Sequence, residues 1–202
     1  MIVDTSEQLV QAIKVGKVVA FPTDTVYGLG CDAQNLAALQ GIYQLKQRPS
    51  EKPLILFVGN SKKVTEFAKV VPPLAQQLMD CFWPGPLTIV LPKKETVSKQ
   101  ISSGLQTIGL RMPNQPEILA LLEQTQVTLA TTSANISGEE AATNSQAVEA
   151  VFGDQVVTFA GTAKCGIPST VIEVTEQNTY RILREGAISE QEISECLHER
   201  KE

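Results

Sequence analysis

The stretch KVVAFPTDTVYGLGCDA, residues 17–33, indicates how the chain folds. Its apolar run Val18 to Phe21 predicts a buried strand, since such runs are typical of strands covered on both faces. The segment PTDTVYGLG that follows is rich in turn formers and predicts a loop shaped by its glycines. Upstream, apolar residues recur at helical spacing behind Thr5, and downstream Asn35 is suited to cap a second helix. Strand and helix therefore alternate, which predicts an α/β protein.

The rest of the chain continues this alternation and predicts a mixed sheet flanked by helices. Strands are predicted at 54–58, 87–91, 107–112, 127–133, 156–161, 170–174 and 179–185, the last two as a hairpin. Helices are predicted at 5–15, 35–45, 61–69, 72–82, 116–124 and 145–152, and from Ser189 to about Arg200. No repeat or linker interrupts residues 1–186, so we expect one domain there and a helical tail over 187–202.

Composition excludes several functional classes. A length of 202 residues suits one domain, and 17 Lys+Arg against 22 Asp+Glu give a net charge of −5, which argues against a broad nucleic-acid surface. The mixed, acidic start and the lack of a long apolar run predict a cytoplasmic protein without a membrane segment. The single histidine, His198, argues against a catalytic triad, a Cys-His pair and a two-histidine zinc site.

The four cysteines and the glycines do not predict a metal or nucleotide motif. Cys31, Cys81, Cys165 and Cys196 form no CxxC pair, and we expect free, inert thiols in a reducing cytosol. No P-loop sequence occurs. The segment GLGCDA at 28–33 fits GxGxxA, but it lies too far beyond the strand end for a dinucleotide fingerprint.

A basic loop is the first candidate binding site. The segment LKQRPSEKP carries Lys46, Arg48 and Lys52, and its prolines restrict the loop, so the three cations could hold an anion. A solvated helix C-terminus would also favour lysine and arginine, and the pattern alone leaves both interpretations open.

Polar residues at strand ends form a second candidate site. Thr131, Ser133 and Asn135 follow an apolar strand, at a position where open α/β sheets bind ligands, although a plain turn would fit as well. Arg111 lies within an apolar strand and should meet an anion or an acidic partner. Ser169 and Arg184 are expected to face the same rim of the sheet.

Together these segments resemble the YrdC-like family of L-threonylcarbamoyladenylate synthases. The resemblance covers about Val18 to Gly186 and rests on AFPTDTVYGLGCDA, KQRP, PGPLTIVLP, IGLRMP, TTSAN followed by SG, PSTVIEV and ILREG, in the order of the family. The KxR and SxN signatures of the family are matched by Lys46/Arg48 and Ser133/Asn135. The resemblance implies the short, single-domain form of the family, with a twisted mixed sheet and a concave basic pocket, and makes 1–186 the catalytic domain.

The resemblance also implies an activity. Members of the family make threonylcarbamoyl-AMP and pyrophosphate from L-threonine, bicarbonate and ATP, with magnesium. A partner transferase complex then carries the threonylcarbamoyl group to the adenosine next to the anticodon of tRNA, so direct contact with tRNA is expected to be weak. We expect no dedicated metal site, with magnesium arriving on the ATP phosphates.

Site residues carry over by position. Lys46 and Arg48 would be catalytic and contact the triphosphate. The resemblance assigns ATP binding to Lys46, Arg48, Lys52, Ser133, Asn135 and Arg184. It assigns threonine binding to Thr25, Arg111, Thr131 and Ser169, with Arg111 gripping the carboxylate.

Two positions depart from the family, and two other functions compete. Lys52 stands where relatives often have asparagine, and Phe57 stands where they often have a histidine that touches threonine, so packing must replace any hydrogen bond there. One alternative is an RNA-binding or ribosome-maturation factor that uses the same basic face. The other is a diverged paralogue group, which the intact KxR and SxN pairs argue against.

Overall fold

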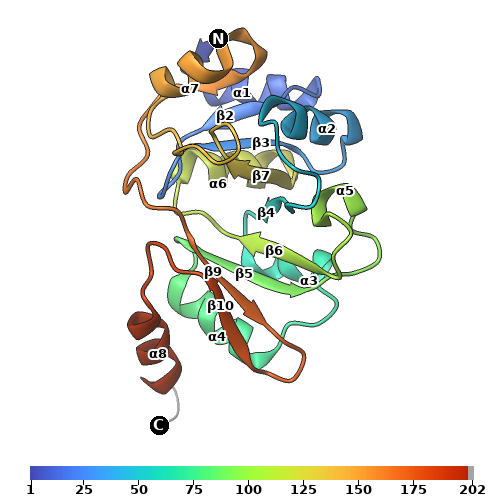
Figure 1. The fold of residues 1–202 in the computed structure, drawn as a ribbon, viewed down its shortest axis with the longest axis vertical. Helices are drawn as coiled ribbons and strands as arrows, with labels where there is room; N and C mark the ends of the chain where they lie inside the picture. The colour runs from blue at the N-terminus through green and yellow to red at the C-terminus, as the bar shows by residue number, and fades with distance from the viewer. Residues whose placement is uncertain (200–202) are drawn as a thin grey trace.

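The expected alternation of strands and helices forms a ten-stranded mixed sheet with helices packed against it (Figure 1). The computed structural model describes residues 1–199. The strands are β1 (Ile2–Val3), β2 (Val19–Phe21), β3 (Gly28–Asp32), β4 (Ile55–Phe57), β5 (Leu87–Pro92), β6 (Thr107–Arg111), β7 (Leu129–Ser133), β8 (Val157–Phe159), β9 (Thr170–Val174) and β10 (Tyr180–Arg184). The helices are α1 (Ser6–Lys14), α2 (Leu36–Leu45), α3 (Val64–Phe67), α4 (Pro73–Phe82), α5 (Lys99–Ser102), α6 (Pro116–Thr125), α7 (Ser145–Phe152) and α8 (Glu190–Glu199), with 3₁₀ turns η1 (Ser61–Lys63) and η2 (Gly153–Gln155).

The strand order brings chemistry-bearing strand ends together at the middle of the sheet. The order is β1-β8-β2-β3-β7-β4-β6-β5-β9-β10. Because β4 and β6 run parallel, Phe57 lies beside Arg111 at their carboxyl ends, and the antiparallel pairing of β4 with β7 sets Ile55 opposite Thr131. The predicted β9–β10 hairpin is confirmed.

Two apolar clusters hold the helices to the sheet. The smaller cluster lies under α1 and α6 and includes Leu9 and Ile118. The larger lies under α2, α4, α7 and α8. The predicted N-caps are confirmed, since the side chains of Thr5 and Asn35 accept hydrogen bonds from backbone amides in the first turns of α1 and α2. No helix in the described part of the chain is long and apolar enough to cross a membrane.

The prediction of a loop at the glycines is wrong, because Gly28–Asp32 forms strand β3 between β2 and β7. The glycines are needed for packing. A Cβ on Gly30 would come within 3.0 Å of the Phe21 ring, and one on Gly28 within 3.1 Å. Glycine in a strand often marks such a close approach, and here it lets Phe21 lie over the strand and reach Phe57, with ring centroids 6.2 Å apart.

The prediction of four free thiols is also wrong. Cys81 in α4 and Cys196 in α8 form a disulfide across a sequence separation of 115, while Cys31 is free and buried and Cys165 is free and exposed. The packing of α8 on α4 brings the two cysteines together. The spacing of the cysteines in the sequence does not predict this pairing. The predicted end of the last helix at Arg200 lies outside the described residues. The boundary at residue 186 stays a prediction, although Ile193 of α8 is buried in the larger cluster.

Reduction of this disulfide is expected to lower the free energy of unfolding by about 2–4 kcal/mol, because the bond restricts the unfolded chain over a long loop. Urea unfolding of the oxidised protein and of the Cys81→Ser/Cys196→Ser variant measures the difference. Cys165→Ser is the matched control and should leave stability unchanged. Equal midpoints for the oxidised protein and the double variant would contradict the role assigned to the disulfide.

Candidate functional site

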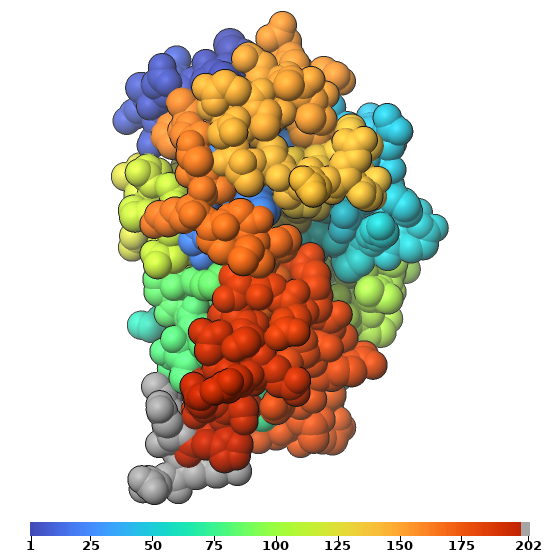
Figure 2. Space-filling model, turned by 60° about the vertical axis from the view of Figure 1, so that its left-hand side comes forward, coloured from blue at the N-terminus to red at the C-terminus, as the bar shows by residue number. Residues whose placement is uncertain are grey.

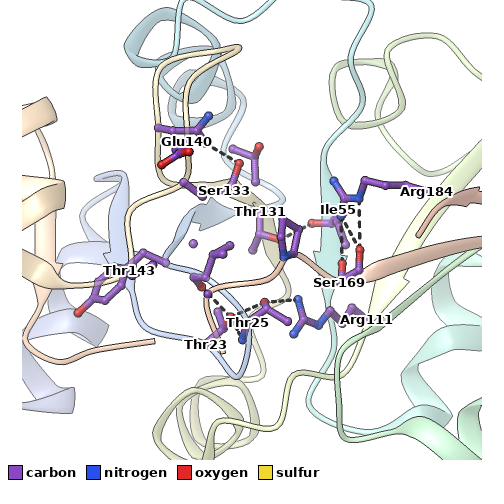
Figure 3. Close-up of a pocket in the computed structure, with 18 of the residues that line it drawn as sticks. Thr23, Thr25, Ile55, Arg111, Thr131, Ser133, Glu140, Thr143, Ser169 and Arg184 are labelled. Carbon is purple, nitrogen blue, oxygen red and sulfur yellow. Dashed lines mark hydrogen bonds between the residues drawn. The ribbon is translucent and has the colours of Figure 1, made fainter. Parts of the chain in front are cut away.

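A hollow of about 600 Å³ lies at the middle of the sheet, and we call it the central pocket (Figure 3). Its volume is typical of a site for a small molecule. Eight of the residues assigned by resemblance line it, namely Thr25, Arg48, Arg111, Thr131, Ser133, Asn135, Ser169 and Arg184. They come from segments far apart in the sequence, and the sheet order brings them together.

The loop that follows β8 completes the rim of the pocket. Gly166 and Pro168 line the pocket, and the Gly166 amide donates to the Thr25 carbonyl at 2.8 Å. Figure 2 shows this orange segment lying against the red C-terminal part of the chain on one face of the molecule. The rim is therefore built from the loop after β2, the loop after β8 and the start of β9.

Arg111, at the end of β6, is buried at one side of the pocket with only 4% of its surface exposed. Its Nη2 donates to Asp24 Oδ1 at 2.6 Å, which confirms the expected acidic partner. Its Nη1 donates to Thr25 Oγ1 at 3.0 Å and its Nε to the Gly85 carbonyl at 3.0 Å. Burial lowers the pKa of Arg111, and the Asp24 carboxylate opposes that shift.

Phe57 forms an apolar wall next to this guanidinium. It lines the pocket, is 4% exposed, and its ring centroid lies 5.5 Å from Arg111 Cζ. At this distance the ring face attracts the guanidinium. Phe57 therefore packs against Arg111, and its expected contact with threonine stays a prediction.

Hydroxyl groups surround the same part of the pocket. Thr23 and Thr25 share a hydrogen bond of 2.8 Å between their hydroxyls. Thr131 Oγ1 donates to the Ile55 carbonyl at 2.9 Å, and Ser169 Oγ lies 2.9 Å from Thr88 Oγ1. These bonds fix the positions of small polar groups that can still accept or donate to a ligand.

Arg184, at the end of β10, lies at the rim of the pocket next to Ser169. Its Nη2 donates to the Ser169 carbonyl at 2.7 Å, which confirms that these two residues face the same rim. Figure 3 shows Arg184 and Arg111 on the same side of the pocket, with Ser169 between them. Burial lowers the pKa of Arg184.

Ser133 and Asn135 form a polar turn after β7, and Lys46 supports it from behind. Ser133 Oγ donates to Asn135 Oδ1 at 2.6 Å. The Lys46 Nζ donates to the Ser133 carbonyl at 2.6 Å, to the Asn135 carbonyl at 2.7 Å and to Asn135 Oδ1 at 3.1 Å. When Lys46 is protonated, its three protons match these three acceptors.

Lys46 and Lys52 are the assigned residues that the pocket lining does not include. Lys46 is 1% exposed. Burial, together with the charges of Arg48 and Lys52, lowers the pKa of Lys46 to about 7. Lys52 is exposed, and its carbonyl accepts from Arg48 Nε at 3.1 Å.

Arg48 brings the basic loop to the pocket. Its Nη2 donates to the Pro53 carbonyl at 2.9 Å, so two backbone oxygens hold the guanidinium at the pocket wall. Burial lowers the pKa of Arg48. The two interpretations left open by the sequence are therefore resolved in part, because Arg48 lines the pocket while Lys52 faces solvent.

Sequence reasoning missed several residues of the site. Asp24 and Thr23 lie in the segment predicted as a loop. The acidic residue among turn formers was the one feature of the sequence that could have indicated a functional role there. Glu139, Glu140 and Thr143 line the pocket from the turn after Asn135, and nothing in their spacing distinguishes them from other surface residues.

A mixed α/β sheet with a central pocket lined by guanidinium groups defines a class of protein whose pocket is suited to small anionic molecules. Within that class, the chain belongs to the Sua5/YciO/YrdC family, whose family model, described as "Telomere recombination", matches residues 11–186.

Relatives and solved structures agree with this assignment. The chain is 40% identical over 189 residues to a threonylcarbamoyl-AMP synthase of Pyrococcus abyssi, and covers 55% of that protein. It is 34% identical over 188 residues to the threonylcarbamoyl-AMP synthase of Vibrio vulnificus, and covers 100% of it. It superposes with a TM-score of 0.92 and 35% identity on a crystal structure of P. abyssi Sua5 complexed with L-threonine, covering 98% of this chain and 61% of that one. The chain thus spans little more than half of the Pyrococcus protein.

Proposed function

We propose that the chain is a threonylcarbamoyl-AMP synthase, which forms threonylcarbamoyl-AMP and pyrophosphate from L-threonine, bicarbonate and ATP. The observation that carries the proposal is that one pocket brings together three guanidinium groups, several small hydroxyls and the apolar ring of Phe57. Arg48 and Arg184 would hold phosphates, while Arg111, Phe57 and the hydroxyls would form the part of the pocket that holds an amino acid. The names of the relatives support this function over an RNA-binding or ribosome-maturation factor.

The reaction joins two anions, and the arginines supply the opposing charge. The threonine amine captures bicarbonate with loss of water, and a carbamate oxygen attacks the α-phosphorus of ATP. The bond between the α-phosphorus and the bridging oxygen breaks, and pyrophosphate leaves. Arg48 and Arg184 would offset the charge on the phosphates, and the pocket would hold the reactants in line.

The smaller part of the pocket would hold threonine. Arg111 would donate to the carboxylate, while the hydroxyls of Thr25, Thr131 and Ser169 would bind the polar groups of the amino acid. Phe57 offers an apolar surface to the threonine methyl group.

The polar turn after β7 would contact ATP through Ser133 and Asn135. Lys46 would act by holding that turn and by placing a charge behind it, since its ammonium already has three partners. Lys52, which faces solvent, could reach a phosphate at the pocket mouth only by changing its side-chain conformation.

The donor set tests the fit to magnesium. Within residues 1–199 no three metal-ligating side chains converge, and the pocket carboxylates are those of Glu139 and Glu140. We therefore propose that magnesium arrives bound to the ATP phosphates, whose charge it would offset.

The product implies a partner. Threonylcarbamoyl-AMP is a mixed anhydride, and a transferase complex in the cytoplasm would use it to modify the adenosine next to the anticodon of tRNA. With a net charge of −5 we expect any direct binding of tRNA to be weak.

Thermal stabilisation by ligands tests whether the two substrates share the pocket. Melting temperatures are compared with L-threonine alone, with ATP and magnesium, and with both, because ligand binding to the folded state raises stability. We expect the largest shift with both present. A combined shift no larger than that with ATP alone would contradict a shared pocket.

ATP binding at pH 8 is expected to take up a fraction of a proton, up to one. The pKa of Lys46 is about 7 in the free protein, so the amine is mostly neutral at pH 8. A nearby triphosphate would raise that pKa and favour the ammonium form. Isothermal titration calorimetry in buffers of different ionisation enthalpy measures the uptake.

Lys46→Met is the matched variant for this measurement, since it keeps the length of the side chain and removes the titrating group. It should abolish the proton uptake and lower activity strongly. Equal uptake in the two proteins would show that another group titrates.

A further inference from the structure

Asp24 forms a buried ion pair with Arg111. Its Oδ1 lies 2.6 Å from Arg111 Nη2, and the two side chains are 7% and 5% exposed. Arg111 lines the central pocket, whereas Asp24 lies behind it and does not. The Asp24 side chain therefore contacts the pocket lining through Arg111.

The hydrogen bonds of Arg111 leave a defined part of the guanidinium for a ligand. A guanidinium carries five N–H groups. Three are used, by the Gly85 carbonyl, Thr25 Oγ1 and Asp24 Oδ1. One N–H then remains on each terminal nitrogen. Two such groups are what a carboxylate accepts in a paired interaction.

Stabilisation of the fold does not by itself explain this ion pair. Asp24 Oδ2 is buried and has no hydrogen-bond partner. Burying a carboxylate is costly, and an ion pair with an unsatisfied oxygen does not recover that cost as well as an apolar pair of similar size would. A buried group that weakens the fold is more readily explained by what it does in the pocket.

Three partners hold the guanidinium group, one at each of its nitrogens. Asp24 is the charged one, and a hydrogen bond between two charged groups is stronger than one to a neutral oxygen. Figure 3 shows Arg111 next to Thr25 and Thr23. These two threonines belong to the loop after β2, which also carries Asp24. Without the carboxylate, Nη2 would lose its strongest partner and the guanidinium could turn away from the pocket.

We propose that Asp24 is the positioning residue of the amino-acid part of the pocket, where it orients Arg111 so that two free N–H groups meet the carboxylate of the amino acid. The inference rests on the proposed function, because it takes Arg111 as the carboxylate partner. Asp24 itself does not touch the substrate.

Steady-state pyrophosphate release by Asp24→Asn tests the proposal. The asparagine keeps an oxygen that accepts from Arg111 and removes the charge. We expect KM for threonine to rise about 10-fold, with kcat and KM for ATP changed less than about two-fold. Asp24→Ala, which removes the oxygen as well, should raise KM for threonine further. Asp154→Asn is the matched control, since that side chain is 99% exposed, and it should behave as wild type.

A double-mutant cycle separates positioning from a general effect on the fold. Asp24→Asn is combined with Arg111→Met, and kcat/KM for threonine is compared with that of Arg111→Met alone. If Asp24 acts through Arg111, it adds less than about two-fold in that background. The double variant removes both buried charges, so it also melts at a higher temperature than Arg111→Met alone.

The outcomes distinguish the two proposals. Wild-type pyrophosphate release that does not need threonine would overturn the proposed function. Release that needs threonine, with an unchanged KM for threonine in Asp24→Asn, would overturn the role of Asp24 alone. The role of Asp24 would also be overturned if the effects of the two substitutions on kcat/KM multiply in the double variant. Equal losses of kcat/KM for ATP and for threonine in Asp24→Asn would overturn it as well.

Discussion

Replacing Arg48 with alanine is expected to lower kcat/KM for ATP by about 100- to 1000-fold. Two backbone carbonyls hold this guanidinium at the pocket wall, so its charge is fixed before ATP binds. A fixed charge stabilises the transition state without having to reorganise, which is why its loss reduces the rate strongly. Arg48 is partly exposed and belongs to neither apolar cluster, so the variant should fold normally.

Pyrophosphate release with saturating threonine and bicarbonate measures this effect, and the melting temperature reports on the fold. Arg181→Ala is the matched control, because Arg181 is 72% exposed on β10, pairs with Glu173 and does not line the pocket. A loss of less than 10-fold in Arg48→Ala would mean that the phosphates are not held at this wall.

Replacing Arg111 with lysine is expected to lower kcat/KM for threonine by about 100-fold while ATP still binds. A lysine keeps the positive charge opposite Asp24, which avoids leaving that carboxylate buried without a partner. It does not reproduce the planar fork that reaches Gly85, Thr25 and Asp24 and leaves two N–H groups free. Arg111→Lys therefore retains the positive charge and loses the geometry that pairs with a carboxylate.

Calorimetric binding of ATP and kinetics with varied threonine measure this second effect. The dissociation constant of ATP should stay within about three-fold of wild type, since Arg48 and Arg184 are unchanged. The whole loss should fall on threonine, and a 100-fold change corresponds to about 2.7 kcal/mol. Equal losses for both substrates would contradict the division of the pocket into two parts.

Local signals predicted the elements that depend on neighbouring residues. Thr5 and Asn35 cap helices because each side chain satisfies an amide three residues along the chain. The pairing of Arg111 with an acidic group also followed from local reasoning, since a charge within an apolar strand needs a partner.

Tertiary packing decided the features that the sequence did not predict. Gly28 and Gly30 suggested a loop, but the ring of Phe21, brought over from β2, fills the space that their side chains would need. The pairing of Cys81 with Cys196 depends on α8 packing against α4. The contact of Lys46 with phosphates stays a prediction, but its bond to the Ser133 carbonyl depends on how the end of α2 meets β7 and could not be predicted from the sequence.

Pyrophosphate release with each substrate omitted in turn is the direct test of whether the chain is a threonylcarbamoyl-AMP synthase. The purified protein is given ATP and magnesium, with and without L-threonine and with and without bicarbonate. We expect pyrophosphate release, with threonylcarbamoyl-AMP in equal amount, when threonine and bicarbonate are both present, and almost none when either is missing. ATP turnover at the same rate without threonine would contradict the proposed function.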